Sequence, residues 1–327
     1  MTNSEKMKPS GLIHALTLDG AGGVTEASLT PVEQLDTGTW LHFQADDEDT
    51  QLWLSEVSGL NDVASGALTA EDTRPRVLRR GDNLLLTLRG ASSRLTEGGG
   101  QDLVSLRIWT NGHSLISARM QGLAATDCLL SELAAGEGPQ SAVELITHWV
   151  DLIVDDMSDE VQAIEGEMSR IEEEVLSETG VSSRSDVLML RKKLIMLRRY
   201  IAPQREALAR LTTETPTWLD EMSRVRLRDI TDRLVRYVEV IDQVSSRASL
   251  VQDEIAAQIS DSMNRRTYIF TVVAAIFLPL GFITGLLGVN VGGVPGVDDP
   301  SAFLQLVIAC TLIGMGLIAA FRWRRWM

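Results

Sequence analysis

Hydrophobic residues are concentrated near the end of the chain, in two uninterrupted apolar runs. Residues 268–287 and 302–321 are each twenty residues long and contain no charged side chain. As helices they are about 30 Å long, which matches the hydrocarbon core of a bilayer. A buried helix of a globular protein normally keeps a polar stripe, and these runs have only small hydroxyls, one Gln and one Cys. The pattern therefore predicts two membrane spans joined by a loop, residues 288–301.

The charges around the spans predict their orientation. The loop between them has no Lys or Arg, whereas basic residues lie at the other end of each span: Arg265, Arg266, Arg322, Arg324 and Arg325. The positive-inside rule places both termini in the cytoplasm and the loop outside, with Trp323 and Trp326 as interfacial anchors. We interpret the membrane as a bacterial inner membrane.

A long helix is predicted to lead into the first span. Neither Gly nor Pro occurs between Thr217 and Leu278, and Thr217 with Asp220 forms a capping-box pattern. A helix from there to Leu287 is about 105 Å long. Apolar residues recur along it at steps of three and four, which predicts a packing seam: Leu227, Ile230, Leu234, Tyr237, Ile241, Val244, Ala248, Val251 and Ile255.

Two further helices of opposite charge are expected before it. Residues 141–178 are strongly acidic and residues 184–210 strongly basic. This pattern favours an antiparallel hairpin with complementary charge. Asp151, Asp155 and Asp159 share one helical face, so a weak divalent-cation site is the alternative for these acids.

Residues 11–135 have the mixed pattern of an α+β domain. Strands are predicted at 84–89 and 103–110, and Asn111-Gly112 predicts a hairpin leading into residues 114–119. Helices are expected at 48–57 and 121–135, and turns at the glycines of 20–23 and 98–100. The predicted organisation is a cytosolic α/β domain (1–138), a cytosolic helical stalk (139–266) and a transmembrane pore domain (267–327).

Composition limits the functions that this organisation can serve. Residues 1–266 carry 27 basic and 43 acidic residues, a formal net charge of −16. Such acidity excludes a nucleic-acid partner and favours cations. Cys128 and Cys310 give neither a disulfide framework nor a structural zinc motif, and no signal peptide precedes the domain. The four histidines (His14, His42, His113 and His148) are scattered. We find no catalytic grouping, so neither an enzyme nor a cofactor is expected.

One face of the long helix stays small or polar as it enters the membrane. Its members follow a second three-and-four series: Asp253, Ala257, Ser260, Asn264, Thr267, Thr271, Ala274, Leu278, Gly281 and Gly285. Packing of small residues between helices explains the two glycines. A water-filled channel explains the whole series, including its cytosolic polar part. Because two spans cannot enclose a pore, several copies must assemble, with the first span inward.

The first span ends in Gly288-Val289-Asn290, and a Gly-x-Asn at this place resembles the CorA superfamily of divalent-cation transporters. Val289 in place of the family's Met is similar to its zinc-transporting ZntB branch. The segments Thr73-Arg74-Pro75-Arg76-Val77, 194–205 and Arg265-Arg266-Thr267-Tyr268 are also similar to that branch. The resemblance implies a funnel-shaped homopentamer whose five long helices line the pore.

The resemblance also implies that Gly288, Val289 and Asn290 recognise the ion at the outer mouth. The transported ion is then Zn²⁺, which crosses at least partly hydrated because the spans offer no His or carboxylate. Asp298 and Asp299 either concentrate cations there or are ordinary turn acids. Uptake is favoured by the membrane potential, and proton symport rests on resemblance. Zinc efflux, a Mg²⁺, Co²⁺ or Ni²⁺ channel, and a membrane-anchored interaction module are the alternatives.

Overall fold

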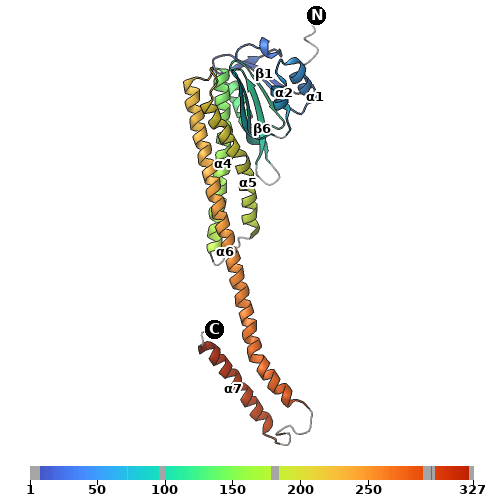
Figure 1. Cartoon of the computed structure of the whole chain (residues 1–327), viewed down its shortest axis with the longest axis vertical. Helices are drawn as coiled ribbons and strands as arrows, with labels where there is room; N and C mark the ends of the chain where they lie inside the picture. The colour runs from blue at the N-terminus through green and yellow to red at the C-terminus, as the bar shows by residue number, and fades with distance from the viewer. Residues whose placement is uncertain are drawn as a thin grey trace. The chain divides into compact units, whose positions relative to one another are not determined.

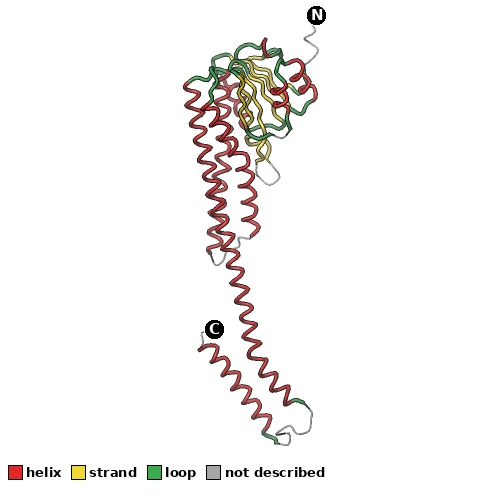
Figure 2. The backbone as a smooth tube through the Cα atoms, viewed as in Figure 1, coloured by secondary structure: helices red, strands yellow, loops and turns green. Residues whose placement is uncertain are grey.

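The computed structural model of the chain describes residues 8–71, 73–95, 101–177, 184–289, 296 and 299–323. The chain divides into two compact units, residues 1–251 and 252–327. The first holds a β-sheet and a bundle of long helices, and the second holds two apolar helices (Figures 1 and 2). Helix α6 (Glu221–Leu287) begins in the first unit and ends in the second. The predicted domain boundaries after residues 138 and 266 stay predictions.

The first unit is built on a seven-stranded sheet of order β2-β1-β3-β7-β6-β5-β4. Neighbouring strands are antiparallel except β3 and β7, which are parallel. The strands are β1 (Leu12–Leu18), β2 (Val24–Glu26), β3 (Thr39–Gln44), β4 (Arg76–Arg80), β5 (Asn83–Leu95), β6 (Gln101–Thr110) and β7 (Leu115–Arg119). The sequence patterns predicted the last three of these strands but not the first four.

The hairpin predicted at Asn111-Gly112 is confirmed between β6 and β7. Thr110 pairs with Leu115, and the Asn111 side chain accepts hydrogen bonds from the backbone of His113 and Ser114, each at 2.9 Å. Gly112 has a φ of 89°, a conformation that favours glycine. The predicted turn at residues 20–23 joins β1 to β2, and the turn predicted at 98–100 lies outside the described residues.

Alternating residues of β3 contact different layers of helices. Leu41 and Phe43 belong to the core shared with α2 (Asp62–Thr69) and with the π-helical segment η3 (Trp53–Val57), which continues the short helix α1 (Glu48–Leu52). Trp40 faces the other way and meets Trp149 of α4 edge-on, with ring centroids 5.0 Å apart. The sheet is therefore covered on both faces. The helix predicted at 48–57 is confirmed as α1 with η3, and the one predicted at 121–135 begins later, as α3 (Ala124–Ala135).

The bundle consists of α4 (Ala142–Leu176), α5 (Arg184–Thr213) and the first part of α6. Later residues of α5 contact earlier residues of α4. Lys193 pairs with Glu160 at 2.8 Å, and Gln204, further along α5, lies 3.9 Å from Met157. This confirms the antiparallel hairpin. The predicted seam of α6 is also confirmed, since Leu227, Leu234 and most of its other members are buried.

The charge complementarity predicted for α4 and α5 was only partly right. Lys193 of α5 forms an ion pair with Glu160 of α4, whereas Glu144, Asp151 and Glu172 of α4 pair with arginines of α6. Arg233 forms ion pairs with both Asp151 and Asp155. Acids on a helix point to several sides, so a third neighbouring helix competes with the second for them.

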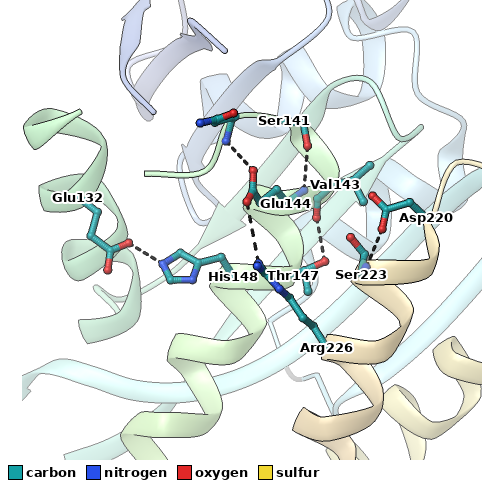
Figure 3. A network of polar contacts seen from close by, with 10 residues as sticks. Glu132, Ser141, Val143, Glu144, Thr147, His148, Asp220, Ser223 and Arg226 are labelled. Carbon is teal, nitrogen blue, oxygen red and sulfur yellow. Dashed lines mark hydrogen bonds and ion pairs between the residues drawn. The ribbon is translucent and has the colours of Figure 1, made fainter. Parts of the chain in front are cut away.

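The predicted start of α6 at Thr217 was wrong. The Thr217 hydroxyl donates to Asp82 at 2.8 Å, and the helix begins at Glu221, capped by Asp220, which accepts from the Ser223 backbone at 2.6 Å. Helix α6 accordingly has 67 residues. Figure 3 shows this start beside that of α4, where Arg226 approaches Glu144 at 3.9 Å.

Candidate functional site: the small and polar face of α6

The predicted stripe lies on α6, and all its members from Asp253 to Gly285 are exposed in the single chain. These members include Ser260, Asn264, Thr267, Thr271, Ala274, Leu278 and Gly281. An exposed series on one continuous helix is a surface open to lipid, water or another copy of the chain.

Helix α7 (Ala302–Trp323) covers a different face of α6. The less exposed side chains of the span are Tyr268, Val272, Ala275, Ile276, Pro279, Leu280 and Ile283. Val272 is only 5% exposed, and a side chain added at Gly314 of α7 would lie 3.9 Å from Leu280. At 100° per residue this face is centred about 140° from the stripe. The small residues of the stripe therefore do not serve α6–α7 packing.

Gly281 and Gly285 test the packing explanation directly. A Cβ placed on either glycine meets no atom within 4 Å in the part of the chain that the structure describes. Glycines that serve helix packing let a neighbouring backbone approach closely. Packing within the chain consequently does not explain these two residues. A channel lining, or packing against another copy, is left as the explanation.

Thr271 presents an acceptor on this face. Its hydroxyl donates to the carbonyl oxygen of Thr267 at 2.9 Å. The proton is thus committed to the helix backbone, and the oxygen lone pairs are free to accept from water. An oxygen acceptor in an apolar wall suits a hydrated cation better than an anion.

The C-terminal end of α6 favours a glycine at position 288. The Gly288 backbone donates to the carbonyl oxygen of Thr284 at 2.9 Å, and a Cβ at Gly288 would lie 3.0 Å from the same oxygen. Val289 follows and is exposed. Asn290, the third predicted residue of this motif, lies outside the described residues. The glycine of the motif therefore has a steric role at the end of the helix.

Asp299 stabilises the turn that begins α7. One of its carboxylate oxygens accepts from the backbone and the hydroxyl of Ser301, both at 2.8 Å. These bonds hold the pKa of Asp299 below its ordinary value. Asp298 lies outside the described residues. These contacts agree with the interpretation of Asp299 as an ordinary turn acid. They involve only one carboxylate oxygen, so the second oxygen can still attract cations.

The alternative cation site on α4 is not formed. Asp151 and Asp155 are both engaged by Arg233, and no group of three His, Cys, Asp or Glu among the described residues is arranged to hold a metal ion. His42 is buried beside Ser117 Oγ at 2.7 Å, and burial holds its pKa well below the ordinary value. His148 contacts Glu132 at 2.5 Å. These two histidines are engaged within the fold.

Both apolar helices have the length and composition of membrane spans. The predicted first span ends at Leu287, where α6 also ends. The predicted second span begins at Ala302, as α7 does, and α7 continues two residues beyond it to Trp323. Trp323 is 88% exposed at the end of α7, as an interfacial anchor would be. The residues after it, which include Arg324, Arg325 and Trp326, lie outside the described part. These features define a membrane protein with two C-terminal spans and a large N-terminal α/β and helical part.

Comparison with known proteins assigns this membrane protein to a family. The family model described as CorA-like Mg²⁺ transporter protein matches residues 36–324. The chain belongs to this family of divalent-metal transporters. It is 32% identical over 321 residues to a zinc transport protein ZntB of Yersinia enterocolitica, a match that covers 98% of each chain.

Solved structures agree with this assignment over the full length. The full-length CmaX protein has a TM-score of 0.83 and 32% identity, covering 98% of this chain and 100% of its own. The CorA magnesium transporter of Methanocaldococcus jannaschii has a TM-score of 0.80 at 19% identity, covering 95% and 98%. The second likeness concerns the fold alone. The predicted CorA-like fold and family are thereby confirmed.

Proposed function

We propose that the chain is a zinc transporter of the bacterial inner membrane, and that five copies assemble with the stripe of α6 around a common water-filled path. The observation that carries this proposal is the continuous small and polar face that α7 leaves uncovered. A membrane anchor needs no such face. The kinship to proteins named zinc transport protein ZntB supports zinc as the cargo.

The ion is recognised at the outer mouth through its hydration shell. Asn290 amides from each copy hydrogen-bond to the water around the ion, and Gly288 and Val289 position them at the end of α6. A strong zinc site needs His, Cys or carboxylate ligands. The spans contain no His or carboxylate, and Cys310 lies on α7. Zinc is therefore held weakly, which fast release requires.

The direction follows from the membrane potential. A doubly charged ion gains about 4.6 kcal/mol for each 100 mV when it enters a negative interior. The sequence has no Walker-type loop to supply ATP energy against that gradient. We therefore propose uptake, with both termini in the cytoplasm. Coupling to protons rests on family resemblance, because neither span carries Asp, Glu, His or Lys as a relay.

The test is ion flux into liposomes that contain the purified protein. A fluorescent zinc indicator inside the vesicles reports entry while pH and voltage gradients are set independently. The proposal is supported if a negative interior drives zinc entry and if added Mg²⁺ inhibits that entry only weakly. Acceleration by an inward proton gradient at fixed voltage supports symport. Mg²⁺, Co²⁺ or Ni²⁺ flux without zinc flux, or zinc movement only out of the vesicle, contradicts the proposal.

A further inference from the structure

A histidine is buried on the face of the sheet that α3 and α4 cover. His42 of β3 has 0% of its surface exposed, and its Nδ1 lies 2.7 Å from Ser117 Oγ of β7. The second ring nitrogen, Nε2, has no hydrogen-bond partner among the described residues. A protonated imidazole donates from both nitrogens. Charging this ring in place would therefore bury an unpaired N–H together with a charge.

A second histidine lies directly beside it. His14 of β1 is the cross-strand neighbour of His42, and the two rings are stacked with centroids 6.1 Å apart. Arg119 of β7 is half-buried on the same face, because it follows Ser117 by two residues on that strand. Asp127 of α3 also acts on His14. The two histidines thus share this layer with one positive and one negative side chain.

Burial is the main reason why these histidines resist protonation. It lowers the pKa of His42 well below the ordinary 6.5, and Arg119 and His14 lower it further. Burial also lowers the pKa of His14, with Arg119 adding to this effect and Asp127 opposing it. A histidine with a lowered pKa in the closed state takes up a proton more readily when the layer opens. The stability of the closed layer is therefore complete above pH 6.5 and declines as pH falls below this value.

Two tryptophans connect His42 to the helices. The rings of Trp40 and Trp149 have their centroids 5.6 Å and 6.0 Å from that of His42. Trp149 belongs to α4, and its Nε1 donates to Thr126 Oγ1 of α3 at 3.2 Å. Both helices thus meet the sheet at the buried histidine, and a change of charge there acts on both of them.

The stretch of α4 beside His42 is also the stretch to which α6 is attached. Glu144 and Asp151 flank Trp149 on α4, and they pair with Arg226 and Arg233 of α6. Figure 3 shows the first of these contacts, between the starts of the two helices. A displacement of this part of α4 therefore changes how α6 is held.

We propose that His42, assisted by His14, forms an acid-sensitive switch: a proton on His42 releases α3 and the first turns of α4 from the sheet and thereby loosens the start of α6. The opposite face of the sheet packs α2 against Leu41 and Phe43, so it keeps its structure when the histidines are charged. The effect on transport rests on the proposed function, whereas the release of the helices does not.

Two other ionisable sites in this layer act in the opposite direction. His148 of α4 contacts Glu132 of α3 at 2.5 Å, so a proton on His148 adds attraction between these helices. Burial raises the pKa of Asp156 in α4, so a proton on this carboxyl group favours its buried state. Neither site would release the helices as pH falls.

The test is hydrogen–deuterium exchange of the full-length protein in detergent, corrected for the intrinsic effect of pH on exchange. Uptake of one proton below pH 6.5 raises the opening equilibrium by about tenfold between about pH 7.5 and about pH 5.5. The protection of α3 is expected to fall by this factor, while α2 keeps its protection. Equal protection of α3 at both pH values, or an equal loss in α2, overturns the inference without any variant.

His42→Asn identifies the group that takes up the proton. Asparagine does not titrate, and its amide places a polar atom where Nδ1 contacts Ser117. The protection of α3 in H42N should lose most of its dependence on pH, even where the protection itself is lower. His113→Asn, at an exposed histidine, is the matched control and should behave as wild type. A tenfold loss of protection in H42N overturns the role of His42.

Zinc flux into liposomes tests the connection to α6. With equal pH on both sides no proton gradient acts, so the comparison reports the state of the protein alone. Flux at about pH 5.5 is expected to be several-fold below that at about pH 7.5 in wild type and H113N, with a much smaller decline in H42N. The same decline in all three proteins overturns the connection. Absence of zinc flux at both pH values contradicts the proposed function instead, while the exchange measurement still decides whether the switch exists.

Discussion

Arg247 of α6 donates hydrogen bonds to both carboxylate oxygens of Glu172 in α4, with Nε lying 2.8 Å from Oε1. The two residues belong to a series of contacts with heptad spacing. Arg226, Arg233 and Arg247 occur at multiples of seven along α6, and their partners Glu144, Asp151 and Glu172 do so along α4. From the Arg226–Glu144 contact to the Arg233–Asp151 contact both helices advance seven residues, and such matched spacing keeps neighbouring helices in register. From there to the Arg247–Glu172 contact α6 advances 14 residues and α4 advances 21, so this last contact does not continue the same register.

The first prediction concerns the energy of this contact. Both side chains are 29% exposed, so solvent screens the pair only partly. We expect a coupling free energy of about 0.5–1 kcal/mol, near the upper end of exposed pairs because two bonds form. Thermal unfolding of Glu172→Gln, Arg247→Met and the double variant measures it. Additive effects of the two single changes would mean that the contact contributes nothing in solution.

The second prediction concerns acid. The hydrogen bond from Arg247, with its charge, holds the pKa of Glu172 below the ordinary 4.5. A carboxylate with a lowered pKa in the folded state stabilises the protein above the unfolded value, and this stability is lost as pH falls through the folded value. The difference in melting temperature between wild type and Glu172→Gln should therefore shrink below pH 4.5. Glu173→Gln, at an exposed neighbour, is the control and should show no such change.

The heptad arginines illustrate how much of the bundle the sequence predicts. Helix identities follow from the apolar seam and the charge content, because both are local to one helix. The partner of each charge does not follow, because α4 presents acids to α5 and α6 alike. The spacing of Arg226 and Arg233 matches that of Glu144 and Asp151, so the sequence could have indicated the α4–α6 register at this end. The same spacing would have assigned Glu165 to Arg247, whereas the structure pairs Arg247 with Glu172.

The sheet shows a different limit. Strands β5 to β7 have apolar runs or a clear hairpin signal, whereas β2 has three residues and β4 is mostly arginine, so neither has the strand pattern. Arg107 within an apolar strand is a sequence signal for a buried charge. The sequence does not tell which groups surround this charge, such as the Ala70 carbonyl oxygen, because that depends on segments far apart in the chain.

The third prediction tests the stripe. Thr271→Phe places a bulky ring on the proposed lining in every subunit, and we expect zinc flux into liposomes to fall by roughly tenfold or more because water is displaced from the path. Val273→Phe adds the same ring on the exposed side away from the stripe and should leave flux nearly unchanged. Normal flux in T271F together with reduced flux in V273F would put the conducting face elsewhere on α6.

The fourth prediction separates a channel lining from packing between copies. A side chain at Gly281 meets no atom in the described part of its own chain. If the face lines water, Gly281→Leu narrows the path but leaves the assembly intact, so we expect reduced flux with an unchanged mass in detergent. Loss of the oligomer in G281L, measured by light scattering, would instead show that helices of neighbouring copies pack at this glycine.

The fifth prediction concerns the outer mouth. If Asn290 amides hold the hydration shell of the ion, Asn290→Ala should greatly reduce zinc flux, by about tenfold or more, because no other side chain of the Gly-x-Asn motif is polar. The oligomer should persist, since the change removes only an exposed amide in this proposal.

Gly288→Ala is expected to impair flux by a different route, because its Cβ would lie 3.0 Å from the Thr284 carbonyl oxygen and distort the end of α6. Gly316→Ala on α7 is the matched control for backbone effects, because it lies outside the stripe and its Cβ meets no atom within 4 Å in the described part of the chain. Flux through N290A equal to that of wild type would remove the amide collar from the mechanism, whatever the glycine variants do.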